Sequence, residues 1–456
     1  MKKYCIILSA LLMVAAVQAQ VQRLGNETAS QKAKRMEWWS DARFGMFIHW
    51  GLYAIPARHE WVKTKEQISD AEYKKYFDAF NPDLYNPSDW AKAAKAAGMK
   101  YVVITTKHHE GFCLFDSRYT GYKATNTQAQ RDLIKAFVTA VRAEGLRVGF
   151  YYSIIDWNHP DFLIDLRHPL RPADKVKITN DQDWNDPRLP ELNKGRDMAK
   201  YRTYMNNQLT ELLTNYGTID ELWLDFIGRK EKTIEDYGSV EVIKLVRRLQ
   251  PDIIVNDRLG LTMYEDGADF KSPEQVGTEE LKKYKGKYWE TCQTFSGPWG
   301  YNRDGNEKWK SNRMILDLLI TSVANGGNLL FNVGPTSRGV FDERTTKSLD
   351  SIGQWMKLNS PAIYGCTFAP DSFKAPEGTR LTYNAKTRKL YVHLFEYPKA
   401  ASYVLPGYKS KVWLARVLSD GSELVIKSGA GNDLELIMPA EKPGDAIPVI
   451  ELSLNN

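Results

Sequence analysis

An acidic residue inside an apolar run is the first candidate for chemistry in this sequence. Residues 221–226 read ELWLDF, and their aromatic and branched side chains are typical of a strand buried on both faces. Asp225 interrupts the run. A carboxylate among apolar neighbours is costly unless it meets partners or water, so we expect Asp225 at the carboxyl end of the strand, facing a pocket. The alternative is a core aspartate that caps the next turn.

Polar or aromatic side chains also lie in or just after four other strand-like runs. In parallel barrels the carboxyl ends of the strands open onto one mouth, where barrel enzymes carry their catalytic groups. A single histidine such as His49 is more often a hydrogen-bonded core residue, but several successive strand ends of this kind indicate a site. Besides Asp225, the residues concerned are His49, His108, His109, Glu110, Tyr151, Tyr152 and Arg258.

Other chemistries find no motif in the chain. The histidines show neither HxH nor HExxH spacing, so a metal site is unsupported. A GxSxG nucleophile turn, a phosphate-binding glycine loop and a dinucleotide fingerprint are also missing from the sequence. We therefore predict no metal and no cofactor.

Paired carboxyl groups fit the residues better. Cleavage of a glycosidic bond needs one carboxyl group to protonate the leaving oxygen and another to attack or stabilise the anomeric carbon. Asp225 is the candidate nucleophile, and the candidates for the acid are Glu274 in DFKSPEQ and Glu290 in YWETC. Glu274 has the alternative of a solvated loop carboxylate, and Glu290 that of a strand-end group paired with an arginine. Composition alone does not choose between them.

Repeated helix, glycine and strand units must position these residues. The expected strands end near His49, Thr106, Ser153, Asp225 and Asn256, with two more at 288–291 and 328–333, and helices such as 131–144 stop at a glycine before the next strand. This alternation predicts a parallel α/β fold, and the number of units favours a (β/α)8-like barrel over residues 20–366. From residue 367 to 456 only strand-like runs and hairpin signals follow, which predicts a C-terminal β-sandwich.

The first residues of the sequence predict that the protein is exported. Lys2 and Lys3 precede an apolar run that ends in a small-residue cleavage pattern before Gln20, so residues 1–19 are predicted to be a signal peptide. The mature protein is then exported, periplasmic or extracellular, without a membrane span.

A net charge of +6 with no basic run gives no support to nucleic-acid binding, whereas 13 Trp and 24 Tyr provide flat faces that suit sugar rings.

The ordered motifs resemble a known family. Over about residues 30–365 the chain is similar to the exo-acting α-L-fucosidases of glycoside hydrolase family 29. The segments that carry the resemblance are FGMFIHWG (44–51), EW (60–61), KHHEGF (107–112), GFYYS (149–153), WLD (223–225), NDR (256–258), DFKSPEQ (269–275), WGY (299–301) and GGNLLFNVGP (326–335). The resemblance implies a retaining glycosidase with a (β/α)8-like catalytic domain, a C-terminal β-sandwich and no metal requirement.

Carried over position by position, the resemblance implies roles for individual residues. Asp225 would be the nucleophile and Glu274 the acid/base, preferred over Glu290 because DFKSPEQ matches the family segment in which the glutamate serves. The residues implied to bind substrate, steady the carboxylates or wall the site are His49, Glu60, Trp61, His108, His109, Tyr152, Trp223, Arg258, Glu290 and Trp299. The expected substrate is a fucosylated oligosaccharide or glycoconjugate; α-L-galactosidase activity and an inactive sugar-binding barrel are the alternatives.

Overall fold

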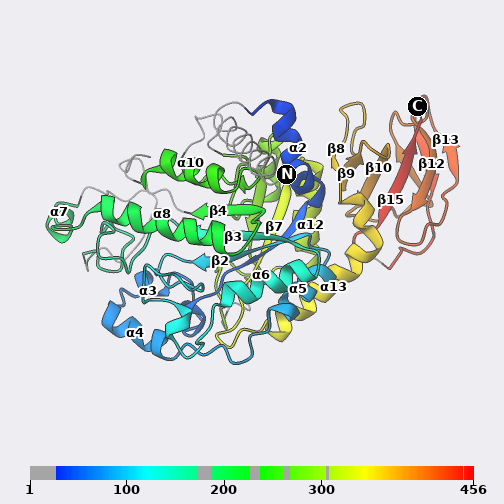
Figure 1. Ribbon diagram of the computed structural model, residues 1–456. Helices are drawn as coiled ribbons and strands as arrows, with labels where there is room; N and C mark the ends of the chain where they lie inside the picture. Colours follow the sequence, from blue (N-terminus) through cyan, green and yellow to red (C-terminus); the bar gives the residue numbers. More distant parts are fainter. Residues whose placement is uncertain are drawn as a thin grey trace, which may run out of the picture.

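The computed structural model describes residues 27–172, 174, 186–225, 237–260, 268–304, 308–444 and 446–455. The predicted signal peptide, residues 1–19, lies outside them. Among the described residues, no helix is long and apolar enough to cross a membrane. Figure 1 shows the two parts of the chain, a large helix-covered barrel and a smaller group of strands beside it.

A parallel sheet forms the centre of the larger part. Its order is β5-β4-β3-β2-β1-β7-β6. Isolated parallel bridges from Asn256 to Phe270 and from Lys271 to Trp289 span the gap between β5 and β6. The short segment Phe270–Lys271 thus completes the ring, and the predicted (β/α)8-like fold is confirmed. The strands are β1 (Phe44–Ile48), β2 (Tyr101–Lys107), β3 (Arg147–Ser153), β4 (Glu221–Asp225), β5 (Ile254–Val255), β6 (Glu290–Gln293) and β7 (Asn328–Val333).

Helices surround this sheet, and two of them begin directly after residues whose side chains cap them. The Asn86 side chain accepts from the Ser88 N–H and Pro87 occupies the first helical position of α5, while Asp132 caps α6. Gly98 and Gly145 follow these two helices with φ of 86° and 75°, a left-handed conformation that glycine adopts without strain. The main helices are α2 (Ala29–Ala42), α5 (Pro87–Ala96), α6 (Leu133–Ala143), α8 (Met198–Asn215), α10 (Ser239–Leu249), α12 (Asn312–Ala324) and α13 (Glu343–Asn359).

Shorter helical segments belong to the connections between these elements. They are η1 (Leu52–Ala54), α3 (Val62–Lys65), α4 (Asp70–Asp78), η2 (Ala124–Asn126), α7 (Leu189–Leu192), α11 (Thr278–Leu281), η3 (Lys282–Tyr284) and η5 (Ser360–Ala362).

Strand alternation divides the core into two layers. Tyr151 and Trp223 belong to an inner cluster with Phe47 and Val103, whereas Phe150 and Leu224 join the larger cluster beneath the helices. Successive side chains of a strand point to opposite faces, so each residue's place in the alternation decides whether it reaches the barrel interior. In β4 the interior set is Glu221, Trp223 and Asp225.

The C-terminal strands form two antiparallel sheets, ordered β12-β15-β10-β9-β8 and β11-β14-β13. Leu390, Val392 and Leu436 lie in the core that both sheets share, as expected of a β-sandwich. Tyr391 and Val449 instead pack into the barrel's cluster, and the Trp355 indole of α13 donates to the Ile447 carbonyl at 2.9 Å. The strands are β8 (Thr367–Phe368), β9 (Thr379–Asn384), β10 (Lys389–Leu394), β11 (Ser402–Leu405), β12 (Val412–Val417), β13 (Ile426–Ser428), β14 (Leu434–Ile437) and β15 (Val449–Leu454).

Candidate active site

Asp225 ends β4 with its carboxylate held by side chains from neighbouring elements. The Tyr151 hydroxyl of β3 donates to Oδ2 at 2.8 Å, and the Arg258 guanidinium donates to Oδ1 at 3.1 Å. His109 Nε2 lies 3.9 Å from Oδ2. Two oriented donors and 12% side-chain exposure leave the carboxylate facing a pocket, as its position at the strand end predicts.

Arg258 joins Asp225 to Glu274. Its second terminal nitrogen donates to Glu274 Oε2 at 2.8 Å, and the Trp299 indole donates to the other oxygen at 3.2 Å. The Glu274 side chain is 39% exposed, so it reaches both the arginine and solvent. One guanidinium contacts two carboxylates only when these lie close together, so the site brings a recessed and an exposed carboxyl group into one place.

His49 and His109 face the pocket as neutral rings. Burial lowers the pKa of each to about 3. The Asn332 side-chain oxygen lies 2.7 Å from His49 Nδ1 and accepts a hydrogen bond from its N–H, because an amide oxygen has no proton to donate. Ser153 donates its own proton to the Ile155 carbonyl, so its oxygen accepts from His109 Nδ1 at 2.7 Å. Both histidines therefore keep a lone pair on Nε2, which suits a donating hydroxyl group.

Glu60 lies at the side of the pocket and fixes the loop of Trp299. Its Oε2 accepts from the backbone N–H groups of Trp299 and Gly300, at 2.8 and 3.1 Å. Its Oε1 lies 3.1 Å from His59 Nδ1, which already accepts the Trp61 N–H. Since that nitrogen offers a lone pair, Glu60 makes a favourable contact only when protonated. Burial raises the pKa of Glu60 to about 7, in agreement with this geometry.

Aromatic rings close the pocket around these groups. Trp299 lies against His49 with ring centres 5.0 Å apart, Trp61 lies 5.2 Å from His109, and Phe47 at the base lies 5.3 Å from Trp223. The lining residues are Phe47, His49, Trp61, His108, His109, Tyr151, Trp223, Asp225, Arg258, Glu274, Cys292 and Trp299. Nine of the twelve residues predicted from the sequence are thus brought together here.

Three predicted residues lie outside this lining, and the positions of two of them, Tyr152 and Glu290, correct the expectation. Tyr152 shares the outward face of β3 with Phe150, and its hydroxyl donates to Gln208 of α8 at 2.8 Å. Tyr151 takes the inward place. Glu290 begins β6 rather than ending it and is fully buried, where it accepts from the Trp223 indole at 3.1 Å. Glu60, the third residue outside the lining, contacts the Trp299 loop directly.

The site also includes supporting residues that the sequence prediction omitted. Asn332 orients His49 and donates to the Trp299 carbonyl at 2.7 Å, while Ser153 orients His109. Both lie near the ends of strands, and FNVGP and GFYYS contain them, so strand-end position was the available signal. No group of three or more metal-ligating side chains occurs in the part of the chain that the structure describes.

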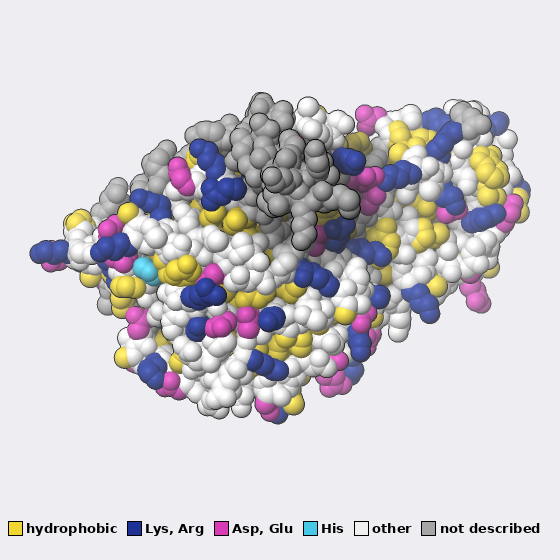
Figure 2. Space-filling model, in the orientation of Figure 1, with side chains coloured by type: hydrophobic (Ala, Val, Ile, Leu, Met, Phe, Trp, Pro, Cys, Tyr) yellow, Lys and Arg dark blue, Asp and Glu magenta, His cyan; other side chains and the backbone are white. Residues whose placement is uncertain are grey.

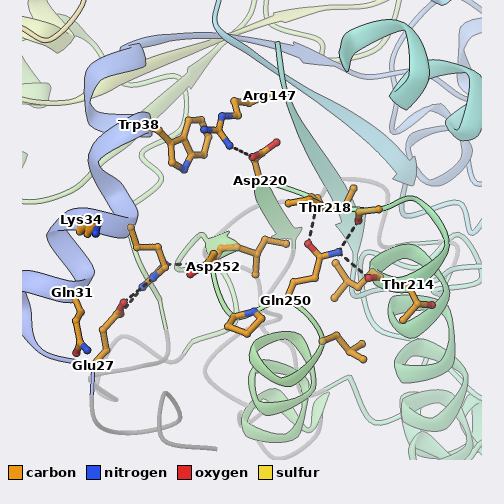
Figure 3. A pocket seen from close by; sticks show the side chains of 17 residues that line it. Glu27, Gln31, Lys34, Trp38, Arg147, Thr214, Thr218, Asp220, Gln250 and Asp252 are labelled. Carbon is orange, nitrogen blue, oxygen red and sulfur yellow. Dashed lines mark hydrogen bonds and ion pairs between the residues drawn. The ribbon is translucent and has the colours of Figure 1, made fainter. Parts of the chain in front are cut away.

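A larger cavity, of about 860 Å³, lies at the opposite end of the barrel (Figure 3). It is lined by residues at the amino ends of β3, β4 and β5, where Arg147 pairs with Asp220 at 2.6 Å and packs on Trp38. The Gln250 side chain is engaged with backbone groups of Ile219 and Leu213. These polar groups are paired with one another, and barrel chemistry belongs to the other end, so we place the active site at Asp225 despite its smaller cavity of about 60 Å³.

A (β/α)8-like barrel with two carboxyl groups on one arginine, set between tryptophan rings, defines a glycoside hydrolase. The sequence model of the family described as "Alpha-L-fucosidase" matches residues 11–361. The chain is 30% identical to the plasma alpha-L-fucosidase of Pongo abelii over 357 residues, which are 72% of this chain and 69% of that protein.

Solved structures agree with the sequence match. The alpha-L-fucosidase isoenzyme 1 from Paenibacillus thiaminolyticus superposes with a TM-score of 0.84 at 42% identity, covering 93% of this chain and 100% of that one. A trapped covalent intermediate of an alpha-L-fucosidase from Bacteroides thetaiotaomicron gives 0.79 at 29% identity, covering 93% and 96%. The chain therefore belongs to the α-L-fucosidase family, glycoside hydrolase family 29, and has α-L-fucosidase activity.

Proposed function

We propose that this enzyme is exo-acting and retaining, and that it removes terminal α-L-fucosyl residues from glycans by double displacement. Asp225 is the nucleophile and Glu274 is the acid/base. The observation that carries the proposal is the contact of both carboxylates with Arg258. Retaining glycosidases need their two carboxyl groups about 5–5.5 Å apart, whereas inverting ones leave room for a water between them.

In the first step, protonated Glu274 donates its proton to the glycosidic oxygen as an Asp225 oxygen forms a bond to the anomeric carbon. The bond to the leaving group breaks, and the departing alcohol keeps the proton. In the second step, the Glu274 carboxylate takes a proton from water, whose oxygen displaces Asp225 from the anomeric carbon. The exposure of Glu274 suits this role, because both the leaving group and water approach from the open side of the pocket.

Recognition of fucose is assigned to the neutral rings and the apolar walls. The Nε2 lone pairs of His49 and His109 accept hydrogen bonds from sugar hydroxyl groups, and Trp61, Trp223 and Trp299 surround the apolar parts of the ring. A site built to hydrogen-bond hydroxyl groups discriminates strongly against sugars that lack them. A pocket closed at its base by Phe47 fits a terminal residue, which supports exo action.

A related protein supports the covalent step. The Bacteroides thetaiotaomicron structure is described as a trapped covalent intermediate in complex with 2-fluoro-fucosyl fluoride, and it was obtained with a variant enzyme. Transfer of that chemistry to Asp225 is our proposal.

Proton NMR of an aryl α-L-fucoside reaction tests the mechanism. We expect α-L-fucose to appear before mutarotation produces the β anomer, with and without a chelator. First appearance of β-L-fucose would exclude Asp225 as a nucleophile. Faster turnover of the matching α-L-galactoside would instead assign the enzyme to that sugar, and binding without turnover would support an inactive barrel.

Export and domain division are further parts of the proposal. We propose a signal peptide at 1–19, a catalytic domain at 20–366 and a β-sandwich at 367–456, with fucosylated glycans met outside the cytoplasm. The positive and apolar start of the sequence supports export. N-terminal sequencing of the protein secreted by its host should begin at Gln20; an intact Met1 in the native protein would contradict export by cleavage.

A further inference from the structure

A buried carboxyl group lies directly beneath one wall of the active site. Glu290 begins β6 and is 0% exposed. The Trp223 indole of β4 donates to its Oε1 at 3.1 Å, and the Tyr101 hydroxyl of β2 donates to its Oε2. Glu290 thus connects three strands across the barrel interior, and it does not line the pocket.

A second carboxyl group accompanies it. Glu221 lies on the same interior face of β4 as Trp223, is also 0% exposed, and its carboxyl group faces that of Glu290. Neither Glu221 oxygen has a hydrogen-bond partner among the described residues, and the charge of Glu290 contributes to raising the pKa of Glu221. Two buried carboxyl groups in contact do not both ionise, so the pair retains a proton. In agreement, burial raises the pKa of Glu290 to about 7, and burial also raises the pKa of Glu221 well above its usual value.

Trp223 connects the buried Glu290 to the groups proposed to react. Its ring lies under the Arg258 guanidinium, 4.9 Å from the ring centre. Arg258 is the residue that contacts both Asp225 and Glu274. The orientation of the Trp223 ring therefore limits where the guanidinium lies, and the guanidinium sets the relative position of the two carboxylates.

We propose that Glu290 is a positioning residue of this enzyme, which holds the Trp223 indole and thereby Arg258, Asp225 and Glu274 in the reactive arrangement. The inference rests on the roles proposed above for Asp225 and Glu274. It gives Glu290 a function other than acid/base catalysis, since a fully buried carboxyl group beneath Trp223 has no path to the glycosidic oxygen.

Three variants test this chain of contacts on aryl α-L-fucosides with good and poor leaving groups. Glu290→Leu removes the acceptor of the indole and should lower kcat about tenfold to a hundredfold on both substrates, with little change in KM. Glu290→Gln offers an amide oxygen to Trp223 and N–H groups to Glu221, so it should restore most of that loss. Glu221→Gln is the matched control, because it removes the partner carboxyl group but leaves the bond between Trp223 and Glu290; its kcat should stay within about twofold.

A double-mutant cycle tests whether Glu290 affects kcat through the Trp223 indole. Trp223→Phe keeps a ring beneath Arg258 but removes the N–H, and it should lower kcat by a factor similar to Glu290→Leu. In the Trp223→Phe background, adding Glu290→Leu should cost less than about threefold. If Glu290→Leu does not fold, Trp223→Phe still decides, because wild-type kcat in that variant would overturn the proposal.

Two further outcomes would overturn the proposal that Glu290 is a positioning residue. Equal losses of kcat in Glu290→Leu and Glu221→Gln would indicate general damage to the core. Loss in Glu290→Gln confined to poor leaving groups, with rescue of Glu290→Ala by azide, would make Glu290 the acid/base. Failure of the proposed mechanism is distinguishable, because it appears in the anomer that the wild-type enzyme releases and not in these variants.

Discussion

The hydroxyl of Tyr151 donates a 2.8 Å hydrogen bond to Oδ2 of Asp225 from the adjacent strand. This bond and the one from Arg258 occupy both oxygens of the carboxylate, one on each side. Since Asp225 is the proposed nucleophile, we expect this arrangement to aim a lone pair into the pocket, so loss of the phenol hydroxyl should affect chemistry more than folding.

Replacement of Tyr151 by Phe should lower kcat/KM about tenfold to a hundredfold, because a hydrogen bond to a charged group is lost where charge changes during the reaction. The neighbouring Tyr152→Phe is the matched control. Its hydroxyl bonds Gln208 in the helix layer, so the variant should lose about 1 kcal/mol of stability and keep kcat/KM within about twofold. A larger kinetic effect in Tyr152→Phe than in Tyr151→Phe would reverse our assignment of the two faces.

Variants of the two carboxylates should behave differently. Asp225→Ala should abolish turnover while the thermal unfolding temperature changes little, because the side chain faces the pocket. An unfolded variant would instead support a capping role for Asp225.

Glu274→Ala should lower kcat/KM about 10²–10⁴-fold on natural glycosides but much less on an aryl fucoside with an acidic leaving group, which departs without a proton. Equal loss on both substrates would remove Glu274 from the acid/base role.

Asn332 should prove important without touching the reacting bond. Asn332→Ala removes the acceptor that fixes the His49 tautomer and the donor to the Trp299 carbonyl, so we expect kcat/KM to fall at least about tenfold. Asn359→Ala is the control, since Asn359 is equally buried and bonds the Trp355 carbonyl within α13. The kinetics of each variant should be measured at the same number of degrees below its own unfolding temperature, so that a loss of activity is not a loss of folded protein. Equal kcat/KM in the two variants would contradict the argument that Asn332 fixes the His49 tautomer.

Stability should depend on pH through Glu60. Its pKa is raised from 4.5 to about 7 in the folded state by burial, so the folded protein binds the proton more tightly than the unfolded chain. This contribution is fully present below about pH 4.5 and is lost as the pH rises through 7, with an upper limit of about 3 kcal/mol.

Urea unfolding at pH 5, 6 and 7 measures this effect. Glu60→Gln should flatten the fall in unfolding free energy relative to the wild type, because the amide has no proton to lose. Glu66→Gln, at an exposed glutamate that pairs with Arg58, should leave the wild-type slope unchanged. A slope in Glu60→Gln as steep as in the wild type would mean that Glu60 is ionised throughout.

Charged side chains of both signs are mixed on the visible surface of the described residues. Figure 2 shows Lys and Arg side chains interspersed with Asp and Glu over the visible face, without a continuous basic stripe. Opposite charges therefore lie near one another on the described part of this face.

Much of the fold was predictable because it depends on local patterns. Helix caps such as Asn86, stop glycines such as Gly98 and apolar runs are properties of neighbouring residues, and they placed the barrel strands in the correct order. The segment Phe270–Lys271, which completes the ring, is too short to leave such a pattern. In the C-terminal part, β11 and β13 are short and largely solvent-accessible, so they lack the continuous apolar signal that would set their bounds in the sequence.

The sequence by itself determined the barrel, the strand that ends at Asp225 and the family. Tertiary structure decided which residues reach the pocket. Tyr151, and not Tyr152, faces inward. The sequence could not predict this, because every residue of β3 after Arg147 is buried and the strand's own pattern does not show which face is the inner one. Glu274 rather than Glu290 meets Arg258 because the stagger of strands in a closed barrel places the start of β6 deep inside it. The inner face of each strand and the shift between neighbouring strands follow from closure of the whole sheet. That closure involves residues far apart in the chain.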